Sequence, residues 1–428
     1  QPDMKTLLNK IFFRSNNLDN VSERLKDLSK KKSVSKIFDI INSYSTSSEI
    51  RYVGGCVRKA INREKIDDID LATNLEPNEV CEALKKNKIN YYETGIDHGT
   101  ITALIDDYKF EITSLREDIS TDGRHAQVKF SNDWKKDALR RDFTINSIYS
   151  DREGNIFDPF NGKEDLEKGF VNFIGDGDKR IKEDYLRILR YLRFFICYSK
   201  QKHNPTTLKI IKKNIDGISR LSKERLLDEL KKIITPNNLI KISKDKQTLD
   251  LLKIVFPELK YIDNFYKINS QAKNFFIEID FLFLLSIMTI DDTDNLDYFL
   301  YKYNLSKKDL NRIKIISDFY KDKPNSTTFS EKNMNKIFYY NGKQAVLDIL
   351  IFNIFRSKKS NQKNISNLIK LYKSKNIPLM PIKADLLMSK YNLSAGRSLG
   401  NKLKLIEKEW VENNFKISDQ QVENIVNN

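Results

Sequence analysis

The pattern of apolar and polar positions divides the chain into two parts. Between residues 50 and 158, short runs alternate apolar with polar side chains, which is typical of half-buried strands. These runs lie at 101–105, 109–115, 128–130 and 143–149. Beyond Asp158, leucine and isoleucine recur at three- and four-residue spacing, which predicts helices. The pattern therefore predicts an α+β fold, with a mixed or antiparallel sheet followed by an all-helical remainder.

Two further helical segments are predicted before and within the strand region. Residues 4–48 show helical spacing, and we expect these helices to cover one side of the sheet. Pro77 begins a short helix that runs to Lys86, because proline is tolerated in the first turn of a helix. The apolar run from Phe281 to Ile290 is too short to span a membrane and predicts a buried helix.

One stretch, residues 51–73, carries the first candidate chemistry. A strand ends at Gly54-Gly55, and a helical run with Arg58 follows. Glycines after a strand let backbone N–H groups approach a phosphate, and the N-terminus of the next helix adds positive charge. A glycine pair alone is more often just a turn. Its combination with the acidic strand that follows indicates an anion site.

That acidic strand is predicted at residues 68–71. Because side chains alternate along a strand, Asp68 and Asp70 share one face, while Ile69 and Leu71 point to the core. Two carboxylates side by side repel each other unless a cation lies between them, and hard oxygen ligands favour Mg²⁺. The alternative is a solvated edge strand. Glu111 either supplies a third carboxylate or faces solvent, and the sequence leaves both open.

Two later motifs carry arginine and aspartate together. Arg140, Arg141 and Asp142 precede the predicted strand 143–149, and arginine suits bidentate phosphate contacts. An exposed Arg-Asp pair at the start of a strand is the alternative interpretation. Asp142 could also accept a hydrogen bond from a ribose hydroxyl.

The second motif lies on a predicted helix, residues 182–195. This helix is apolar almost all round, so its polar stripe with Asp184 and Arg187 should face the interior. An acceptor beside a donor matches the base edges of cytosine and adenine, whereas uracil and guanine would leave buried groups unpaired, at about 1–3 kcal/mol each. A salt bridge between the two is the alternative. Arg190 stays near this stripe, and Arg193 lies on the other side of the helix.

The composition indicates a polyanionic partner and argues against structural zinc. Lysine and arginine exceed aspartate and glutamate by 75 − 59 = 16, which favours a polyanion such as nucleic acid or a membrane surface, although a lysine-rich surface spread evenly for solubility gives the same excess. The three cysteines are scattered, which is typical of a reducing compartment. Acidic residues at 19, 23 and 27 count against a cleaved transit peptide, so we expect a cytoplasmic protein, with the mitochondrial matrix as the alternative.

Taken together in chain order, these motifs resemble those of the class II CCA-adding enzymes, the tRNA nucleotidyltransferases of the poly(A) polymerase family. The matching segments are 54–58 (GGCVR), 68–70 (DID), 94–100 (TGIDHGT), 122–126 (DGRHA), 140–146 (RRDFTIN), 183–187 (EDYLR), 222–225 (SKER) and 396–400 (GRSLG). The match is dense over residues 50–230 and thin elsewhere. One residue departs from the pattern: Lys59 stands where the family often has aspartate.

The resemblance implies a fold, substrates and roles. After N-terminal helices (1–48) it implies a head (49–158), a neck (159–235), a body (236–325) and a tail that binds tRNA (326–428). It implies that Asp68 and Asp70 bind two Mg²⁺ ions and that CTP and ATP are the substrates. Glu111 is included as a further catalytic residue because of its place on the predicted strand 109–115. The residues expected to bind nucleotide are Gly54, Gly55, Arg58, Arg140, Arg141, Asp142, Asn146, Asp184, Arg187, Arg190 and Arg193. A flexible loop, thought to act in the switch from C to A, is expected around Arg116, Asp122, Gly123 and Arg124.

The implied activity is stepwise addition of C, C and A to the 3′ end of tRNA, with no membrane partner. A poly(A) polymerase, an enzyme that adds only CC or only A, and a catalytically inactive RNA-binding protein are the alternatives. The intact loop counts against CC-only addition, and both aspartates count against an inactive protein. The sequence leaves the oligomeric state open.

Overall fold

The computed structural model describes residues 17–121, 126–276, 278–356 and 362–428. The chain divides between Arg225 and Leu226 into two compact units, each of which has its own hydrophobic core. The first unit contains the sheets, and the described part of the second is helical. This agrees with the α+β fold that the sequence predicts.

The first unit is built on one mixed sheet. Among its described residues, seven strands lie in the order β3-β4-β5-β2-β1-β8-β9. Their bounds are β1 Ile50–Val53, β2 Asp70–Thr73, β3 Asn90–Gly95, β4 Thr100–Ile105, β5 Tyr108–Ser114, β8 Tyr149–Ser150 and β9 Ile156–Phe157. The central pair β2 and β5 is parallel, and the other neighbours are antiparallel.

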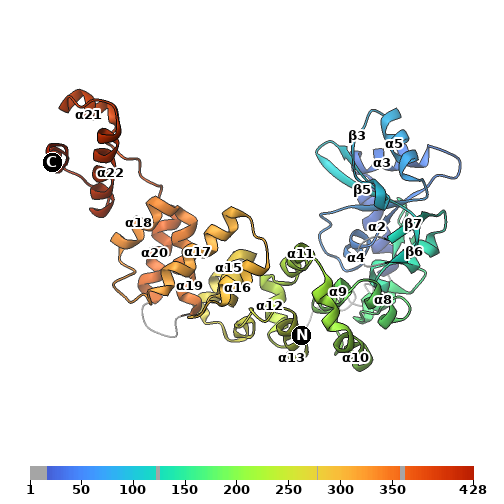
Figure 1. Cartoon of the computed structure of the whole chain (residues 1–428). Helices are drawn as coiled ribbons and strands as arrows, with labels where there is room; N and C mark the ends of the chain where they lie inside the picture. The colour runs from blue at the N-terminus through green and yellow to red at the C-terminus, as the bar shows by residue number, and fades with distance from the viewer. Residues whose placement is uncertain (1–16, 122–125, 277, 357–361) are drawn as a thin grey trace, which may run out of the picture. The chain divides into compact units, whose positions relative to one another are not determined.

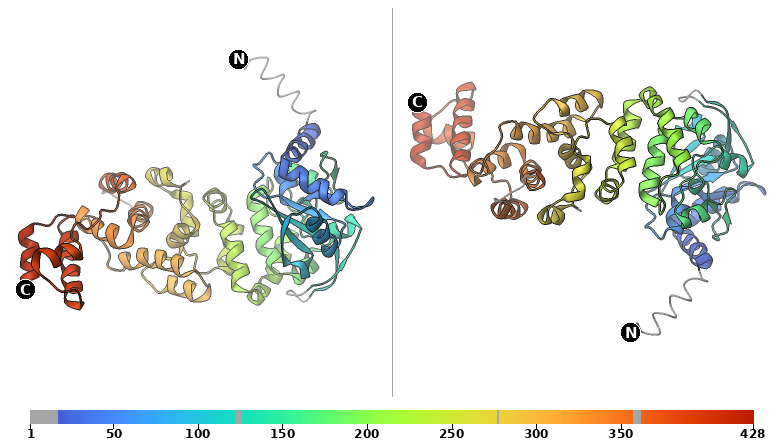
Figure 2. Two further views of the ribbon diagram at one scale, coloured as in Figure 1. Left: turned by 90° about the horizontal axis from the view of Figure 1, so that it is seen from above. Right: turned by 90° about the horizontal axis from the view of Figure 1, so that it is seen from below.

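Helices cover one face of this sheet. They are α2 (Asn17–Ser29), α3 (Lys32–Asn42), α4 (Gly55–Ile61) and α5 (Pro77–Lys86). Their buried side chains, such as Leu25, Phe38 and Val57, pack with Tyr52 and Phe110 of the strands. Figure 1 shows α3 and α5 beside β3 and β5, and Figure 2 shows the N-terminal helices in blue along one side of the strands. The expected cover of N-terminal helices is therefore confirmed for the described residues, and the stretch 4–16 lies outside them.

The opposite face carries a smaller apolar cluster. Val53, Ala72 and Tyr149 of the sheet pack against Ala138 and Trp134 of α6 (Trp134–Leu139). A separate two-stranded sheet, β6 (Arg116–Thr121) with β7 (Ala126–Phe130), is antiparallel and contacts α6. The sequence predicted the strand at 128–130 but not β6.

Two predicted strands are wrong in part. The stretch 143–149 forms a 3₁₀ turn, η2 (Thr144–Asn146), and only Tyr149 enters a strand. All seven of its residues are buried, so no solvent-facing side imposes strand alternation. The strand predicted at 68–71 begins at Asp70, which leaves Asp68 in the segment before it.

Helices complete the first unit. They are α7 (Gly162–Lys168), α8 (Gly177–Glu183), α9 (Leu186–Tyr198), α10 (Pro205–Asn214) and the start of α11 (Lys223–Ile233), with the 3₁₀ turns η1 (Ile96–His98) and η3 (Ile215–Arg220). An aromatic cluster fixes α9 against the segment that follows α6: the ring of Phe143 lies 4.8 Å from that of Phe173 and 5.6 Å from that of Phe194. The sheet and the α9 helix are thereby held as parts of one core.

Proline begins several of the described helices, as expected of a residue whose missing N–H costs nothing in the first turn. Pro77 begins α5, and the Glu76 and Glu79 side chains form a capping box there, so the helix predicted from Pro77 to Lys86 is confirmed. Pro205 begins α10, and Pro236 begins α12 (Pro236–Ile242).

The described part of the second unit contains helices and no strands, as the yellow-to-red ribbon of Figure 2 shows. The α-helices, which continue from α11, are α12 (Pro236–Ile242), α13 (Lys246–Val255), α14 (Ser270–Phe275), α15 (Phe281–Thr289), α16 (Asn295–Lys302), α17 (Lys307–Lys321), α18 (Glu331–Asn341), α19 (Lys343–Arg356), α20 (Gln362–Ser374), α21 (Ala384–Tyr391), α22 (Arg397–Glu412) and α23 (Asp419–Asn427), with the 3₁₀ turn η4 (Ile262–Lys267). Helix α15 is buried from Phe283 to Thr289, as predicted. Within the residues the structure describes, no helix has both the length and the apolar character needed to cross a membrane.

Candidate active site

The glycine pair lies at the edge of a cavity in the first unit. Gly54 links β1 to α4 with φ 65° and ψ −117°, a conformation that side chains disfavour. A Cβ placed on Gly55 would lie 3.8 Å from Asp70 Oδ2. Helix α4 has only seven residues, so we assign the positive charge at this site to arginine side chains rather than to the helix end.

Three carboxylates lie close enough to the start of β2 for their charges to interact. Asp70 is the first residue of β2, and Glu111 is its register partner on the parallel strand β5. Phe110 and Ile112 are buried while Glu111 is exposed, as strand alternation predicts. Burial and, next, the charge of Glu111 raise the pKa of Asp70, and Asp68 adds to this, while Arg141 opposes it.

A divalent cation fits this arrangement chemically. Carboxylate oxygens are hard ligands, and a cation would relieve the repulsion that raises the pKa of Asp70. Across the described ranges, however, no group of three or more His, Cys, Asp or Glu side chains is arranged around a common point. Asp70 is therefore the best supported ligand, with Asp68 and Glu111 as its nearest acidic neighbours.

Arg58 is a buried arginine of α4 that faces the cavity. Its guanidinium donates a hydrogen bond to Asn146 Oδ1 and lies over the rings of Phe194 (4.8 Å) and Tyr198 (5.0 Å). Contacts with aromatic faces hold a guanidinium without neutralising it. The guanidinium of Arg58 is thus fixed at the cavity that the glycine pair also lines.

Asp142 is the centre of the next group. Its Oδ1 accepts from Asn146 Nδ2 (3.0 Å) and from the Phe143 amide (2.8 Å), and its Oδ2 accepts from Arg190 Nε (2.6 Å). Burial would raise the pKa of Asp142, but the charge of Arg190 and these hydrogen bonds outweigh it and lower the pKa. Both oxygens are engaged within the protein, so a ribose contact would be an additional bond to an occupied carboxylate.

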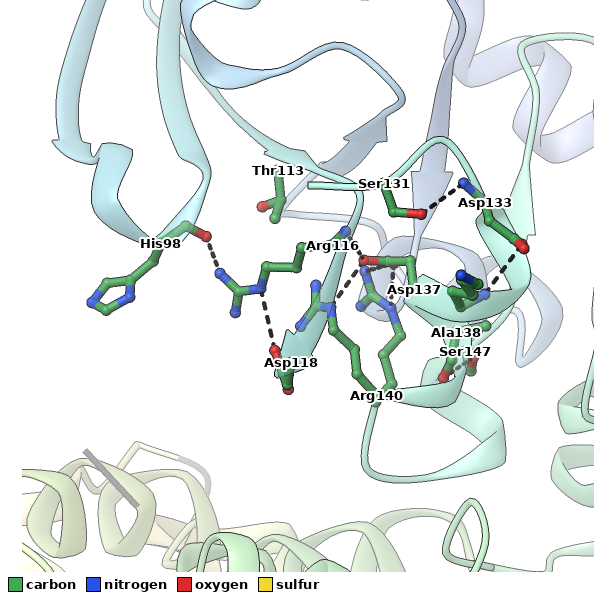
Figure 3. Close-up of polar contacts among 12 residues, drawn as sticks. His98, Thr113, Arg116, Asp118, Ser131, Asp133, Asp137, Ala138, Arg140 and Ser147 are labelled. Carbon is green, nitrogen blue, oxygen red and sulfur yellow. Dashed lines mark hydrogen bonds and ion pairs between the residues drawn. The ribbon is translucent and has the colours of Figure 1, made fainter. Parts of the chain in front are cut away.

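Arg140 and Arg141 share a buried carboxylate that the sequence analysis missed. Asp137 lies one helical turn before them, accepts from Arg140 Nε (3.0 Å) and from Arg141 Nη2 (3.2 Å), and accepts from the Tyr149 hydroxyl (2.6 Å). Figure 3 shows Asp137 beside Arg140. Burial raises the pKa of Asp137, but the charges of Arg141 and Arg140 outweigh burial and lower it to about 2.

The predicted helix 182–195 is interrupted. Helix α8 ends at Glu183, Asp184 is extended (φ −154°, ψ 105°), and α9 begins at Leu186. The prediction of a single continuous helix is therefore wrong. The apolar pattern continues on both sides of Asp184, so it did not indicate a break.

Asp184 and Arg187 have separate partners rather than forming a salt bridge with each other. Asp184 Oδ2 accepts from Arg225 Nη2 (2.8 Å), and Asp184 Oδ1 accepts from the Leu186 amide (3.1 Å). Arg187 Nη1 donates to Glu183 Oε2 (2.7 Å) and to the Arg180 carbonyl (2.7 Å). Arg225 thus holds Asp184 in place, and Glu183 holds Arg187 in place.

A cavity of about 450 Å³ in the first unit brings most of the predicted nucleotide-binding residues together. Its lining comprises Gly54, Gly55, Arg58, Asp70, Arg140, Arg141, Asp142, Asn146, Asp184, Leu186, Arg187, Arg190, Arg193, Phe194 and Arg225. Arg193 also lines it, although it was expected on the other side of the helix from Asp184. Asp68 and Glu111 lie outside this lining.

Leu186, Phe194 and Arg225 are lining residues that the sequence analysis did not assign to the site. Arg225 stands in the SKER segment, which was noted only as part of a resemblance. Arg225 lies far from its partner Asp184 in the sequence, so the sequence did not indicate that the two would pair.

The predicted flexible loop is only partly described. Asp122, Gly123 and Arg124 lie outside the described residues. Arg116 begins β6, and its guanidinium donates to the His98 carbonyl (Figure 3). The departing residue Lys59 forms an ion pair with Asp67 (3.5 Å).

Comparison with known families agrees with this geometry. Residues 50–172 match the family described as the Poly A polymerase head domain, and residues 204–262 match a probable RNA and SrmB-binding site of polymerase A. The fold and the site thus define a nucleotidyltransferase of the poly(A) polymerase type. Nucleotidyltransferases of this type use a divalent metal ion.

Relatives of known name narrow this class. The chain is 32% identical over 379 residues to human mitochondrial CCA tRNA nucleotidyltransferase 1, which covers 87% of this chain and 85% of the relative. It is 31% identical over 317 residues to the CCA-adding enzyme of Staphylococcus haemolyticus, covering 71% of this chain and 73% of the relative. The chain therefore belongs to the CCA-adding tRNA nucleotidyltransferase family.

Solved structures share the fold. The Bacillus stearothermophilus CCA-adding enzyme in complex with CTP has a TM-score of 0.65 at 20% identity and covers 90% of this chain and 93% of its own. The Thermotoga maritima CCA-adding enzyme complexed with tRNA has a TM-score of 0.60 at 20% identity and covers 95% and 98%. At this identity the likeness concerns the fold.

Proposed function

We propose that this chain adds C, C and A stepwise to the 3′ end of tRNA, using CTP and ATP and releasing pyrophosphate. One observation carries the proposal: a single cavity is lined at once by Asp70 with the glycine pair and by Asp184 with Arg187. The first group suits a triphosphate, and the second suits a base edge. The names of the relatives and the bound CTP and tRNA of the structural neighbours support the same substrates.

The acidic group is assigned to metal binding. We assign two Mg²⁺ ions to Asp68 and Asp70, with Glu111 next to them. Held there, the ions would supply a lowered pKa for the attacking 3′-hydroxyl and stabilisation of the charge on the leaving pyrophosphate. Because Gly54 and Gly55 have no side chains, there is room for phosphate oxygens beside Asp70.

The arginines are assigned to the triphosphate and sugar. Arg58, Arg140 and Arg141 line the cavity. Aromatic rings hold Arg58, and Arg140 and Arg141 share a single carboxylate, that of Asp137. Fixed guanidinium groups lose little conformational freedom when they bind a phosphate. Asn146 and Asp142 maintain this arrangement through their mutual hydrogen bond.

Base choice is assigned to Asp184 and Arg187. Cytosine and adenine each present an amine donor beside a ring-nitrogen acceptor, which complements a carboxylate next to a guanidinium, and no nucleic-acid template is required. Arg225 and Glu183 keep the two side chains oriented before the nucleotide enters. Uracil or guanine would leave buried groups unpaired at the same positions.

The test supplies a tRNA lacking its CCA end, with Mg²⁺, and each nucleoside triphosphate alone and then CTP together with ATP. Growth by three nucleotides is the expected result. A long adenosine ladder identifies a poly(A) polymerase, growth by only CC or only A identifies a partial enzyme, and binding without growth identifies an inactive RNA-binding protein.

A matched pair of variants completes this test. Asp70→Asn removes a negative charge from the cavity, and we expect it to abolish growth while tRNA binding persists. Asp67→Asn is the control, because Asp67 is exposed and forms only a surface ion pair with Lys59. If Asp70→Asn keeps the parent turnover, the metal assignment is wrong.

The compartment is part of the proposal as well. We place the protein in the cytoplasm, with the mitochondrial matrix as the alternative, because the human relative is named as mitochondrial. Localisation of the tagged full-length protein in its own cell distinguishes the two.

A further inference from the structure

Asp137 is a buried acid that no part of the proposed mechanism uses. Its side chain is 1% exposed, and it lies in α6 next to the cavity without lining it. A buried carboxylate is costly unless it is paired and hydrogen-bonded. Two arginines and a tyrosine hydroxyl donate to Asp137, and the arginine charges lower its pKa.

The contacts of Asp137 determine how two cavity arginines point. Arg140 reaches Oδ1 through Nε (3.0 Å), and Arg141 reaches Oδ2 through Nε (3.3 Å) and Nη2 (3.2 Å). The Tyr149 hydroxyl donates to the same Oδ2 and accepts from Arg141 Nε (3.0 Å). Both guanidinium groups are therefore anchored on their Nε side, while both arginines line the cavity.

The same carboxylate also binds the root of the β6–β7 hairpin. Oδ1 accepts from the backbone amide of Arg116 (3.3 Å), the first residue of β6. Figure 3 shows that the Arg116 side chain points the other way, toward His98 and Asp118. Burial and, next, the charge of Arg140 lower the pKa of Arg116 to about 10, so positive groups crowd this region.

One buried carboxylate thus contacts the side chains of Arg140 and Arg141 and the backbone of Arg116, whose own side chain pairs with Asp118. Without it, Arg140 and Arg141 would repel each other and Arg116, and would lose the acceptor that fixes their direction. We propose that Asp137 is a positioning residue for the triphosphate: it aims Arg140 and Arg141 into the cavity and holds the hairpin root in register with them. This inference rests on the proposed function, because it assigns these arginines to nucleotide phosphates.

The test measures binding of CTP and of CMP to the full-length protein with Mg²⁺ and without tRNA. Asp137→Asn keeps the size of the side chain and removes its charge. We expect its affinity for CTP to fall by about ten- to a hundredfold, because the guanidinium groups of Arg140 and Arg141 would no longer point at the phosphates. Affinity for CMP should fall much less, since CMP lacks the β- and γ-phosphates, so the ratio of the two affinities drops.

The control is another buried carboxylate with a bidentate arginine. Asp348 is 2% exposed and accepts from Arg312 Nε (2.7 Å) and Nη2 (3.0 Å) in the second unit. Asp348→Asn should lower the melting temperature without changing the ratio of CTP to CMP affinity. It thus separates a general loss of stability from a loss of phosphate binding.

A milder variant keeps the proposal testable if Asp137→Asn does not fold. Tyr149→Phe removes one hydroxyl donor from Asp137 and leaves every charge in place. We expect the ratio of CTP to CMP affinity to fall by a few-fold, as for the loss of one hydrogen bond to a charged group.

Two outcomes overturn the inference. If the variants bind CTP and CMP in the parent ratio, or if both affinities fall equally with the melting temperature, Asp137 has only a structural role. Failure of the parent chain itself to bind CTP and ATP is a different result, because it contradicts the proposed function rather than the role of Asp137.

Discussion

Arg187 is held on two sides before any nucleotide binds. Glu183 accepts one of its hydrogen bonds, and the Arg180 carbonyl accepts another. An arginine fixed in this way is a selective donor, because a base must present its acceptor at one place. Its proposed partner in base choice, Asp184, is fixed separately by Arg225.

We expect Arg187→Ala to relax the choice among nucleotides. The variant should incorporate UTP and GTP at rates closer to those for CTP and ATP, with discrimination reduced about tenfold or more, since each unpaired buried group costs about 1–3 kcal/mol. Single-turnover incorporation of each nucleotide measures this. Arg152→Ala is the control, because Arg152 pairs with Asp39 and lies outside the cavity lining. A variant that remains fully selective places base choice elsewhere.

The pH dependence of stability provides a test at Asp137. Its folded-state pKa of about 2 is lower than the ordinary value near 3.9 in an unfolded chain. Ionised Asp137 therefore contributes stability that is present above about pH 4 and is lost as the pH falls toward 2. We expect the unfolding free energies of the parent and of Asp137→Asn to differ by a constant amount, about 2 kcal/mol, from pH 5 to 7 and to converge at lower pH. Denaturant titrations across this range measure the difference, and an unchanged gap at pH 3 contradicts the assignment.

For single residues, the sequence predicted which side chains line the site better than it predicted which residues hold them in place. Arg58, Arg140, Arg187 and Arg190 line one cavity, as the motifs suggested. Asp137 was missed because an acid three and four residues before two arginines is a common surface pattern. Only burial distinguishes it from such a pair.

Two adjacent glycines between β1 and α4 have different constraints. Gly54 has positive φ, whereas Gly55 is the first residue of α4 and its Cβ would meet Asp70 Oδ2 and Arg58 Nη2 at ordinary contact distance, 3.8 Å. Gly54 is needed because the backbone has a positive φ there. Gly55 is needed because a side chain would occupy part of the cavity.

We expect the two alanine variants to separate these needs. Gly54→Ala should lower the free energy of unfolding by about 1–3 kcal/mol, the usual strain for a side chain in such a conformation. Gly55→Ala should keep most of the stability and weaken CTP binding, because its methyl group enters the cavity. Thermal denaturation and nucleotide binding, measured on both variants, check the contrast. Equal effects of both changes on stability would contradict it.

Helices were predicted more accurately than the segments between them. Helix α5 and the buried helix α15 follow local signals, namely proline, capping side chains and continuous apolar sequence. The break at Asp184 and the turn at residues 144–146 depend instead on distant partners such as Arg225 and Arg58. Such partners cannot be inferred from local periodicity.

At the scale of the whole molecule, the excess positive charge is the main property. The formal net charge is +16, and the proposed partner, tRNA, is a polyanion. Nucleic-acid binding that neutralises phosphates releases counterions, so affinity falls as salt rises. The four-part division into head, neck, body and tail stays a prediction, because the two compact units do not test it.

We expect tRNA binding by the full chain to weaken by about tenfold or more between 50 and 200 mM salt, since several Lys and Arg side chains neutralise phosphates. Filter binding at a series of KCl concentrations gives the slope. A flat dependence would mean that the charge excess serves solubility alone.

The parallel pairing of Asp70 with Glu111 has a thermodynamic consequence for folding. Like charges held together on neighbouring strands oppose folding, and a divalent ion bound at Asp70, as proposed, would relieve that repulsion. An ion that binds only the native state raises the melting point by mass action. Calorimetric scans of the parent chain and of Asp70→Asn with increasing Mg²⁺ or Mn²⁺ would thus test the proposed site independently of any turnover, because only the parent chain should be stabilised.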